Sequence, residues 1–206
     1  MIQPRILRDR VKSHLLEQIQ LGNLHIGKTI NLAAVARETG ISVTPVREAL
    51  SQLEHARIVK AIPNRGFIIL PLGASEAKHL YETVAQLEVM ALENTLFTSD
   101  YIEELRKHFN QMENKNGVAG RFEFHRLLIH NCANPILKQI LTDLKARLFF
   151  YEQILPENHV VDHQMELQNE AILDAIEENN IPTAALILKM HWMTILERVQ
   201  NQFAKD

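Results

Sequence analysis

Apolar residues recur at the three- and four-residue spacing of an α-helix along most of the chain. Residues 5–20 carry a rough apolar stripe and predict a first helix. Residues 31–39 predict a second helix, with Asn31 as its N-cap and Gly40 just past its end, where a left-handed backbone is common. The start of the chain is therefore predicted to be helical, with short turns between the helices.

A third helix is predicted to begin after Ser42, to contain Pro45 in its first turn and to end near residue 56. Its apolar face should pack inward and consists of Val46, Ala49, Leu50 and Leu53. Its polar face should be exposed and consists of Thr44, Arg47, Glu48 and Ser51. Two short helices joined by a tight turn predict a helix-turn-helix.

Two segments rich in β-branched and apolar residues follow, at 58–62 and 66–70. Residues 63–65 separate them, and Gly66 can adopt the positive φ that a tight turn requires. We predict a β-hairpin wing with Arg65 at its tip, where the guanidinium can approach a DNA backbone or enter a minor groove. The alternative is an exposed hairpin arginine without a function.

Residues 71–73 are the expected boundary between two domains, at 1–72 and 73–206. Six helices are predicted beyond it, at 74–97, 99–114, 119–133, 135–154, 161–178 and 181–203. Asn134 and Asn180 are predicted helix caps. The predicted core stripes include Leu80, Val84, Leu87, Ala91, Ile187, Met190, Ile195 and Val199. The fold class is mainly α: a winged helix-turn-helix, then an antiparallel bundle of six or seven helices.

Charge is distributed unevenly between these two domains. Residues 1–72 contain ten Lys and Arg against five Asp and Glu, a net charge of +5, whereas residues 73–206 contain twelve against twenty, a net charge of −8. A basic domain that contains a helix-turn-helix indicates attraction to the phosphates of DNA. Ordinary surface solubility is the alternative if charge is considered alone.

Composition excludes several classes of protein. The single cysteine, Cys132, excludes an internal disulfide, and it is expected to be a buried thiol rather than a redox sensor. No apolar run approaches the length of a membrane span and no signal peptide is recognisable, so a cytoplasmic location is expected. Glycine-rich phosphate loops, nucleophile elbows and zinc-protease motifs are absent from the sequence, which argues against an enzyme.

Residues 42–50 read SVTPVREAL, preceded by VARETGIS and followed by IVKAIPNRGFIIL. This motif resembles the winged helix-turn-helix of the GntR family of bacterial transcription regulators. The resemblance implies a homodimer on a short palindrome of double-stranded DNA, and family habit favours repression. It also implies a set of DNA-contacting residues, namely Ser42, Val43, Thr44, Arg47, Asn64, Arg65 and Gly66.

Two departures from the family pattern affect the expected DNA contacts. Many relatives carry an arginine where this chain has Val43, and an arginine- or glutamate-rich helix where it has residues 32–34, so two polar contacts are missing. Val43 can contact a thymine methyl group instead, and affinity is expected to depend more on Arg47, Arg65 and the first helix. The alternative for Arg47 is an ion pair within the chain, with Glu48 or Glu54.

The rest of the chain resembles the all-helical FCD domain of the FadR and VanR branch of that family. In this domain an aspartate and a histidine one helical turn apart, with two further histidines, hold a divalent metal that helps to bind a carboxylate effector. His125 and His191 align with two of these ligands. Arg121 stands at the aspartate position and Asn169 at a histidine position, so the resemblance implies only half of the ligand set.

Two alternatives remain for this effector site. The first is a pocket without metal, in which Arg121 binds an anionic effector such as an organic acid, beside His125, Asn169 and His191. The second is a rearranged site for a zinc- or nickel-type ion, in which the two histidines recruit a substitute ligand, namely His130, His163 or Glu170. Arg121 has a further alternative, an ion pair with Glu123 or another acid at the surface.

The sequence favours a DNA-binding transcriptional regulator whose helical domain dimerises and senses a small metabolite. A ligand-blind regulator that uses the bundle only to dimerise is the alternative, and a metal-dependent hydrolytic enzyme is least favoured. Four aromatic residues of the bundle are expected to be plain core rather than the lining of an apolar ligand cavity: Phe149, Phe150, Tyr151 and Trp192.

Overall fold

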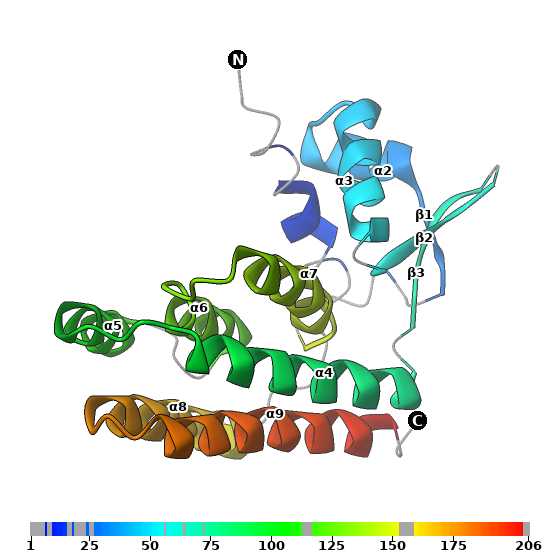
Figure 1. Ribbon diagram of the computed structural model, residues 1–206. Helices are drawn as coiled ribbons and strands as arrows, with labels where there is room; N and C mark the ends of the chain where they lie inside the picture. The colour runs from blue at the N-terminus through cyan, green and yellow to red at the C-terminus, as the bar shows by residue number, and fades with distance from the viewer. Residues whose placement is uncertain are drawn as a thin grey trace. The chain divides into compact units, whose positions relative to one another are not determined.

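The structure is a computed structural model, and it describes residues 7, 10–15, 18, 24, 27–55, 57–63, 65–71, 73–112, 117–152 and 159–203. At residues 150, 151 and 159–162 it describes the backbone alone. The chain forms two compact units, Met1–Leu72 and Gly73–Asp206. Figure 1 labels the helices and strands of both units.

The first unit contains the predicted helix-turn-helix. Helix α2 (Leu32–Thr39) begins after Asn31, whose side chain accepts a hydrogen bond from the backbone N–H of Ala34. It ends at Gly40, which has a φ of 67°. Helix α3 (Val43–His55) follows after a short turn. Because an asparagine cap satisfies a free N–H and glycine adopts a left-handed backbone without strain, these residues define both ends of α2 as predicted.

A three-stranded antiparallel sheet completes this unit, in the order β1, β3, β2 (Figure 1). The strands are β1 (Thr29–Ile30), β2 (Val59–Ile62) and β3 (Gly66–Ile69). β2 and β3 are the predicted wing hairpin. The sequence pattern does not predict β1, because two residues are too short to show the alternation of a strand.

Residues 10–15 form part of the predicted first helix and contact α2. The guanidinium of Arg10 donates to the backbone carbonyl of Thr39, 2.9 Å away, at the end of α2 where carbonyls lack helical partners. His14 lies 2.9 Å from a carboxylate oxygen of Glu38. The buried residues of this segment are Val11 and Leu15. Most other residues of the predicted helix lie outside the described part of the chain.

Six α-helices form the described part of the second unit, as predicted. They are α4 (Ala74–Glu93), α5 (Ser99–Gln111), α6 (Val118–Leu128), α7 (Pro135–Glu152), α8 (His159–Glu177) and α9 (Ile181–Phe203). α4 and α9 lie side by side, α7 packs against α4, and α8 packs against α9 (Figure 1). α5 and α6 contact each other and α8. No helix in these described ranges is long and apolar enough to cross a membrane.

Helices α4 and α6 end earlier than predicted, and one contact lies just beyond both ends. Thr95 and Cys132 pair as an isolated antiparallel β-bridge. Because both residues must leave helical geometry to form it, α4 ends at Glu93 and α6 ends at Leu128, short of their predicted ends. Cys132 is a free, buried cysteine.

Asparagine caps begin the two helices of this unit whose starts are marked by a proline. The side chain of Asn134 accepts from the backbone N–H of Leu137 at 3.0 Å, at the start of α7. The side chain of Asn180 accepts from the backbone N–H of Thr183 at 3.2 Å, at the start of α9. Both predicted caps are confirmed.

The core of the second unit differs from the predicted stripes at three positions. Leu87 and Ile187 are only half-buried, and Met190 is 53% exposed. Glu88 on α4 and Leu188 and His191 on α9 are fully buried instead. Apolar residues spaced three to four apart fit more than one set of neighbouring positions on a helix. Packing then decides which set faces inward.

Candidate functional site

The exposed face of α3 contains residues predicted to contact DNA. Its buried face consists of Val46, Ala49, Leu50 and Leu53, each at most 5% exposed. Its exposed face begins with Ser42, Val43, Thr44 and Arg47. Val43 is 42% exposed, so an apolar side chain is available for contact at this end of the helix. Ser51 is half-buried, so the prediction that it faces outward is only partly correct.

The turn before α3 determines where this exposed face begins. Ile41 is buried, and its backbone N–H donates to the carbonyl of Ala36 at 3.0 Å. The carbonyl of Ser42 accepts from the backbone N–H of Val46 at 3.5 Å, which places Ser42 at the N-cap position. The exposed side chains therefore lie at a helix N-terminus, where backbone N–H groups without helical partners favour a phosphate.

Arg47 is exposed, and the described structure pairs it with neither Glu48 nor Glu54. The carboxylate of Glu54 instead accepts from the backbone N–H of Ala61 in β2 at 2.7 Å, which ties the end of α3 to the wing. The guanidinium of Arg47 therefore remains available for a phosphate or for a base edge.

The tip of the wing is also exposed. The backbone N–H of Arg65 donates to the carbonyl of Ile62 at 3.0 Å and closes the turn. Gly66 has a φ of 93°, and an added Cβ would lie 3.2 Å from a methyl group of Leu32, so both backbone and space favour glycine. Asn64, another predicted contact residue, lies outside the described residues.

The second unit buries all four predicted effector-site residues, which are at most 1% exposed: Arg121, His125, Asn169 and His191. Hydrogen bonds join His125 to His191, whereas the side-chain oxygen of Asn169 has no partner among the described residues. The prediction of a surface ion pair between Arg121 and Glu123 is wrong, because Glu123 pairs with Arg126.

Arg121 forms a buried ion pair with Glu152, the last residue of α7. The hydroxyl of Tyr81 on α4 donates to the other oxygen of that carboxylate at 2.8 Å, so the pair joins three helices. Burial raises the pKa of Tyr81 well above its usual value, which keeps the hydroxyl protonated. Two further donors of Arg121, Nε and one Nη, have no partner among the residues that the structure describes.

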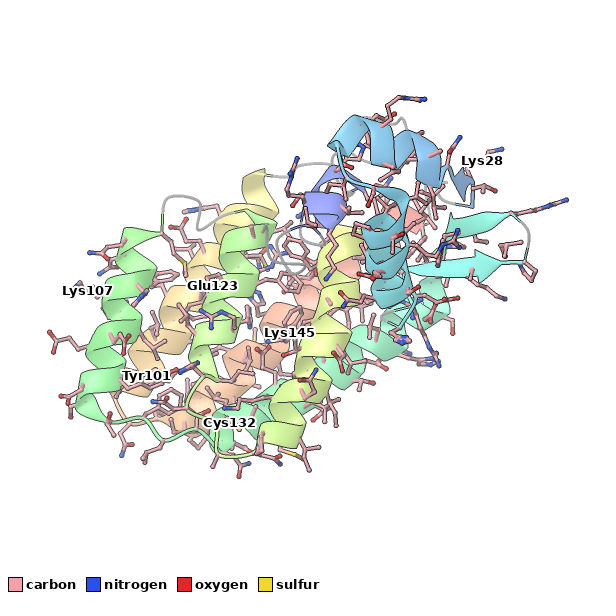
Figure 2. The ribbon with its side chains drawn as sticks, turned by 90° about the horizontal axis from the view of Figure 1, so that it is seen from above. Lys28, Tyr101, Lys107, Glu123, Cys132 and Lys145 are labelled. Carbon is pink, nitrogen blue, oxygen red and sulfur yellow. The ribbon has the colours of Figure 1, made fainter. Side chains whose placement is uncertain are left out.

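Glu88 is the centre of a neighbouring buried cluster. It accepts hydrogen bonds from the ammonium of Lys145 on α7, from the indole N–H of Trp192 on α9, and from Nδ1 of His125 at 3.0 Å. Burial raises the pKa of Glu88, but interactions with His125 and Lys145 outweigh it and lower the pKa from 4.5 to about 2. Figure 2 shows Lys145 among the helices of this unit. Glu88 is therefore an ionised carboxylate inside the bundle.

The protons on the two histidines follow from the ionisation of Glu88. An ionised carboxylate only accepts hydrogen bonds, so Nδ1 of His125 carries a proton. Burial lowers the pKa of His125, although Glu88 partly opposes this. Burial together with nearby Arg121 and Lys145 lowers the pKa of His191 well below its usual value, so both rings are neutral. Nε2 of His125 then accepts from Nε2–H of His191, 3.1 Å away. Nδ1 of His191 is left as an acceptor without a partner in the described structure.

Sequence analysis does not identify Glu88, Lys145 or Glu152 as members of these clusters. A signal exists for them: on α7 the inward positions are Leu137, Leu141, Lys145, Leu148 and Glu152, all at most 8% exposed and spaced three or four residues apart. A charged residue at a position of the apolar stripe therefore indicates a buried charge that needs a partner. Glu88 occupies such a position on α4.

The buried residues do not fit a divalent metal ion. Among the described residues, no group of three or more His, Cys, Asp or Glu side chains could hold one. The three substitute ligands expected for a rearranged site are all exposed: His130, His163 and Glu170. Arg121 and Lys145 place fixed positive charges near both histidines, and like charges oppose the entry of a cation.

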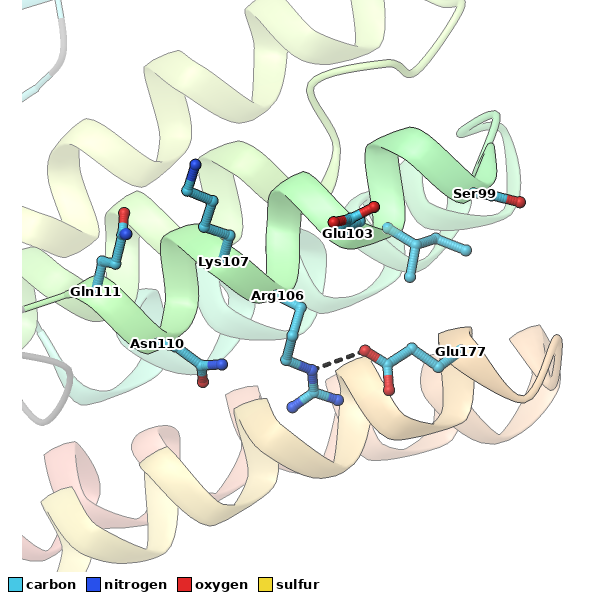
Figure 3. Close-up of a pocket in the computed structure, with 8 residues that line it drawn as sticks. Ser99, Glu103, Arg106, Lys107, Asn110, Gln111 and Glu177 are labelled. Carbon is cyan, nitrogen blue, oxygen red and sulfur yellow. Dashed lines mark hydrogen bonds and ion pairs between the residues drawn. The ribbon is translucent and has the colours of Figure 1, made fainter.

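Two surface grooves border α5. The larger, of about 710 Å³, lies between α5 and α8, and Lys107 and Arg106 line it (Figure 3). Arg106 pairs with Glu177 at 2.7 Å and with Asp174 at 2.5 Å, so its charge is already balanced. The smaller groove, of about 480 Å³, lies between α5 and α6, and its lining includes His108, Arg126 and His130. Neither groove includes a residue of the buried clusters.

Comparison with known protein families matches both units. Residues 7–69 match the model described as "Bacterial regulatory proteins, gntR family". Residues 79–194 match the model of the FCD domain. Together these two matches span most of the chain.

Curated relatives align with most of this chain and with most of their own length. The HTH-type transcriptional regulator YdhC of Bacillus subtilis is 26% identical over 202 residues, which cover 92% of this chain and 89% of that protein. The HTH-type transcriptional regulator McbR of Escherichia coli is 26% identical over 175 residues, with coverage of 77% and 79%. The HTH-type transcriptional repressor GlaR of Escherichia coli is 20% identical over 210 residues, with coverage of 92% and 94%.

Solved structures have the same fold. The structure of Escherichia coli McbR/YncC superposes with a TM-score of 0.78 at 20% identity, covering 98% of this chain and 100% of the other. A transcriptional regulator from Rhodococcus sp. RHA1 superposes with a TM-score of 0.70 at 19% identity, covering 96% and 97%. At this level of identity the similarity establishes the fold.

Proposed function

Because the chain belongs to the GntR family of bacterial regulatory proteins and carries an FCD domain, we propose that it binds a short palindromic operator as a homodimer, controlled by a small anionic metabolite. The chain is an HTH-type transcriptional regulator that binds DNA, and not an enzyme. The palindrome, the dimer and the metabolite are the proposed parts. We also place the protein in the cytoplasm, where bacterial DNA lies.

The exposed N-terminal end of α3 is the observation that carries the DNA-binding part. Its side chains Ser42, Thr44 and Arg47 are polar, exposed and held on a helix whose opposite face is buried. A helix of this kind enters the major groove with its N-terminal residues towards the bases. Arg65 at the wing tip supplies an exposed cation for the adjacent backbone or minor groove.

A dimer is proposed because one recognition helix contacts only a few base pairs. Two copies related by a two-fold axis read an inverted repeat, and the symmetry of the DNA then mirrors that of the protein. Repression is the proposed outcome, since the similar protein GlaR is named a repressor.

An anionic effector is proposed from two buried donors of Arg121, Nε and one Nη, which have no partner among the described residues. The side-chain oxygen of Asn169 and Nδ1 of His191 also lack partners there, but they are acceptors and would need a donor, such as a hydroxyl group, on the same ligand. Each such atom costs about 1–3 kcal/mol when it stays unpaired, so a ligand that supplies partners is favoured. A guanidinium selects a carboxylate or a phosphate. If the ligand binds two arrangements of the dimer unequally, it changes operator affinity.

Operator binding tests the proposal directly. Duplexes selected from a random library should converge on an inverted repeat, and fluorescence anisotropy should then compare wild type with Arg47→Ala. Loss of this contact should weaken specific binding by about 1–3 kcal/mol per half-site, with the fold unchanged.

Lys107→Ala is the matched control, because it removes one exposed positive charge from α5 in the other unit. It should leave operator affinity unchanged. Equal affinity of Arg47→Ala and wild type would refute the assignment of α3 as the reading helix, and selection of a sequence without symmetry would refute the palindrome.

A further inference from the structure

The buried clusters of the FCD domain balance their own charge. Glu88 and Glu152 are paired with Lys145 and Arg121, one cation for each carboxylate. A divalent cation entering this interior would lose its hydration. Among the described residues no buried carboxylate lacks a cationic partner, so nothing would compensate for that cost.

The two histidines are not prepared for a metal in the same way. A histidine that binds a metal through one nitrogen usually donates its other N–H to an acceptor, which fixes the ring. His125 has such an acceptor, because its Nδ1 donates to Glu88 at 3.0 Å. Nδ1 of His191 has no hydrogen-bond partner among the described residues. Among the described residues, His191 therefore lacks the second hydrogen bond that usually orients a metal-binding histidine.

We propose that this FCD domain works without a metal, and that Arg121 supplies the positive charge that a divalent ion provides in the ligand set implied by the family resemblance. Arg121 is suited to this role because its side chain is 2% exposed and held by Glu152. Its Nε and one Nη have no partner among the residues that the structure describes. The ligand class, a small anion at these two donors, rests on the proposed function, whereas the exclusion of metal does not.

Metal content of the wild-type protein is the first measurement. Protein purified without a tag or a chelator should contain no stoichiometric transition metal by elemental mass spectrometry. Zn²⁺ and Ni²⁺, added singly, should not raise its unfolding temperature. About one ion per chain that disappears in His125→Ala/His191→Ala would overturn the proposal.

A reconstructed ligand set gives the opposite expectation. Arg121→Asp with Asn169→His restores the family donors, and Glu152→Gln removes the carboxylate that would lose its partner. This triple variant should bind about one Zn²⁺ or Ni²⁺ per chain, and saturating metal should raise its unfolding temperature by on the order of 10 °C. Adding His125→Ala and His191→Ala to it should abolish both effects.

A folded triple variant that binds no metal would show that Arg121 is not what excludes the ion, and would overturn the proposal. If the triple variant does not fold, the wild-type metal content and thermal shift still decide the question. Operator binding by wild type in EDTA is measured separately. Failure to bind the operator both in the presence and in the absence of EDTA would count against the proposed function. Binding without EDTA that is lost when EDTA is added would count against metal independence.

Discussion

At the scale of single residues, burial gives two arginines opposite roles. Arg47 is exposed and unpaired with its neighbouring glutamates, so its charge is available to DNA. Arg121 is buried and paired with Glu152, so its charge belongs to the interior of the FCD domain. A buried ion pair contributes little net stability as a whole, but removal of one partner is costly.

Removal of the Glu152 carboxylate should destabilise the FCD domain strongly. Glu152→Ala leaves Arg121 as a buried charge without its ionic partner, which costs about 3–5 kcal/mol. Urea unfolding followed by the fluorescence of Trp192 measures this free energy of unfolding, because Trp192 is the single tryptophan and is buried in this domain.

Glu123→Ala is the control for burial. Glu123 and Arg126 form the same kind of ion pair at 2.6 Å, but their side chains are 47% and 57% exposed. Loss of this exposed ion pair should lower the free energy of unfolding by about 0–1 kcal/mol. If both variants lost the same stability, the buried pair would not have the role described for it.

At the scale of the elements, the turn between α2 and α3 places the reading face. Gly40 ends α2 with a left-handed backbone, and the N–H of the next residue, Ile41, returns to the carbonyl of Ala36. This turn sets the direction in which α3 begins, while Glu54 holds the wing to the end of α3. The geometry of the DNA-binding surface thus depends on a few local bonds.

Gly40→Ala should destabilise the N-terminal unit by about 1 kcal/mol, because L side chains disfavour the left-handed region. No atom lies within 4 Å of the added Cβ, so the cost comes from the backbone alone. Far-UV circular dichroism in urea measures it, since the single tryptophan lies in the other unit.

Gly40→Asn is the matched variant at the same position. Asparagine tolerates the left-handed region better than alanine does, so this variant should lose less stability. An alanine variant as stable as wild type, or less affected than the asparagine variant, would contradict a backbone requirement at Gly40.

At the scale of the whole molecule, the proposed function requires a second copy, and we predict that it binds where apolar side chains are exposed. We define the methionine patch as Met90, Leu186 and Met190, which are 48%, 60% and 53% exposed. α4 and α9 pack side by side and run antiparallel (Figure 1). Trp192 on α9 donates to Glu88 on α4, so Met90 and Met190, each two residues from this contact, should lie at a similar level along the helix pair. Exposed apolar clusters commonly mark protein interfaces.

Met190→Glu should convert the dimer to a monomer of 23.7 kDa, because a carboxylate without a partner would be buried in the interface. Light scattering coupled to size exclusion measures the mass. Operator affinity should fall together with the dimer, since each copy reads one half-site.

Leu167→Glu tests whether any exposed apolar residue has this effect. Leu167 on α8 is 52% exposed and lies outside the methionine patch. The Leu167→Glu variant should remain dimeric. Dissociation by Leu167→Glu, or a dimer that survives Met190→Glu, would place the interface elsewhere.

Much of the fold follows from local sequence signals. The six helices of the FCD domain, the helix-turn-helix and the wing hairpin are all present as predicted, and Asn31, Asn134 and Asn180 accept the expected cap hydrogen bonds. The early ends of α4 and α6 could not be predicted, because the bridge between Thr95 and Cys132 joins residues far apart in the chain.

The two candidate sites also differ in how far the sequence alone predicts them. Sequence by itself determined which face of α3 is exposed, and hence the proposed DNA-reading face, because the buried and exposed positions of α3 lie within a few turns of one helix and follow its period. Only the tertiary structure decided the interior of the FCD domain. Glu88 meets Lys145 across 57 positions and Arg121 meets Glu152 across 31, and which charges become neighbours depends on how the helices pack.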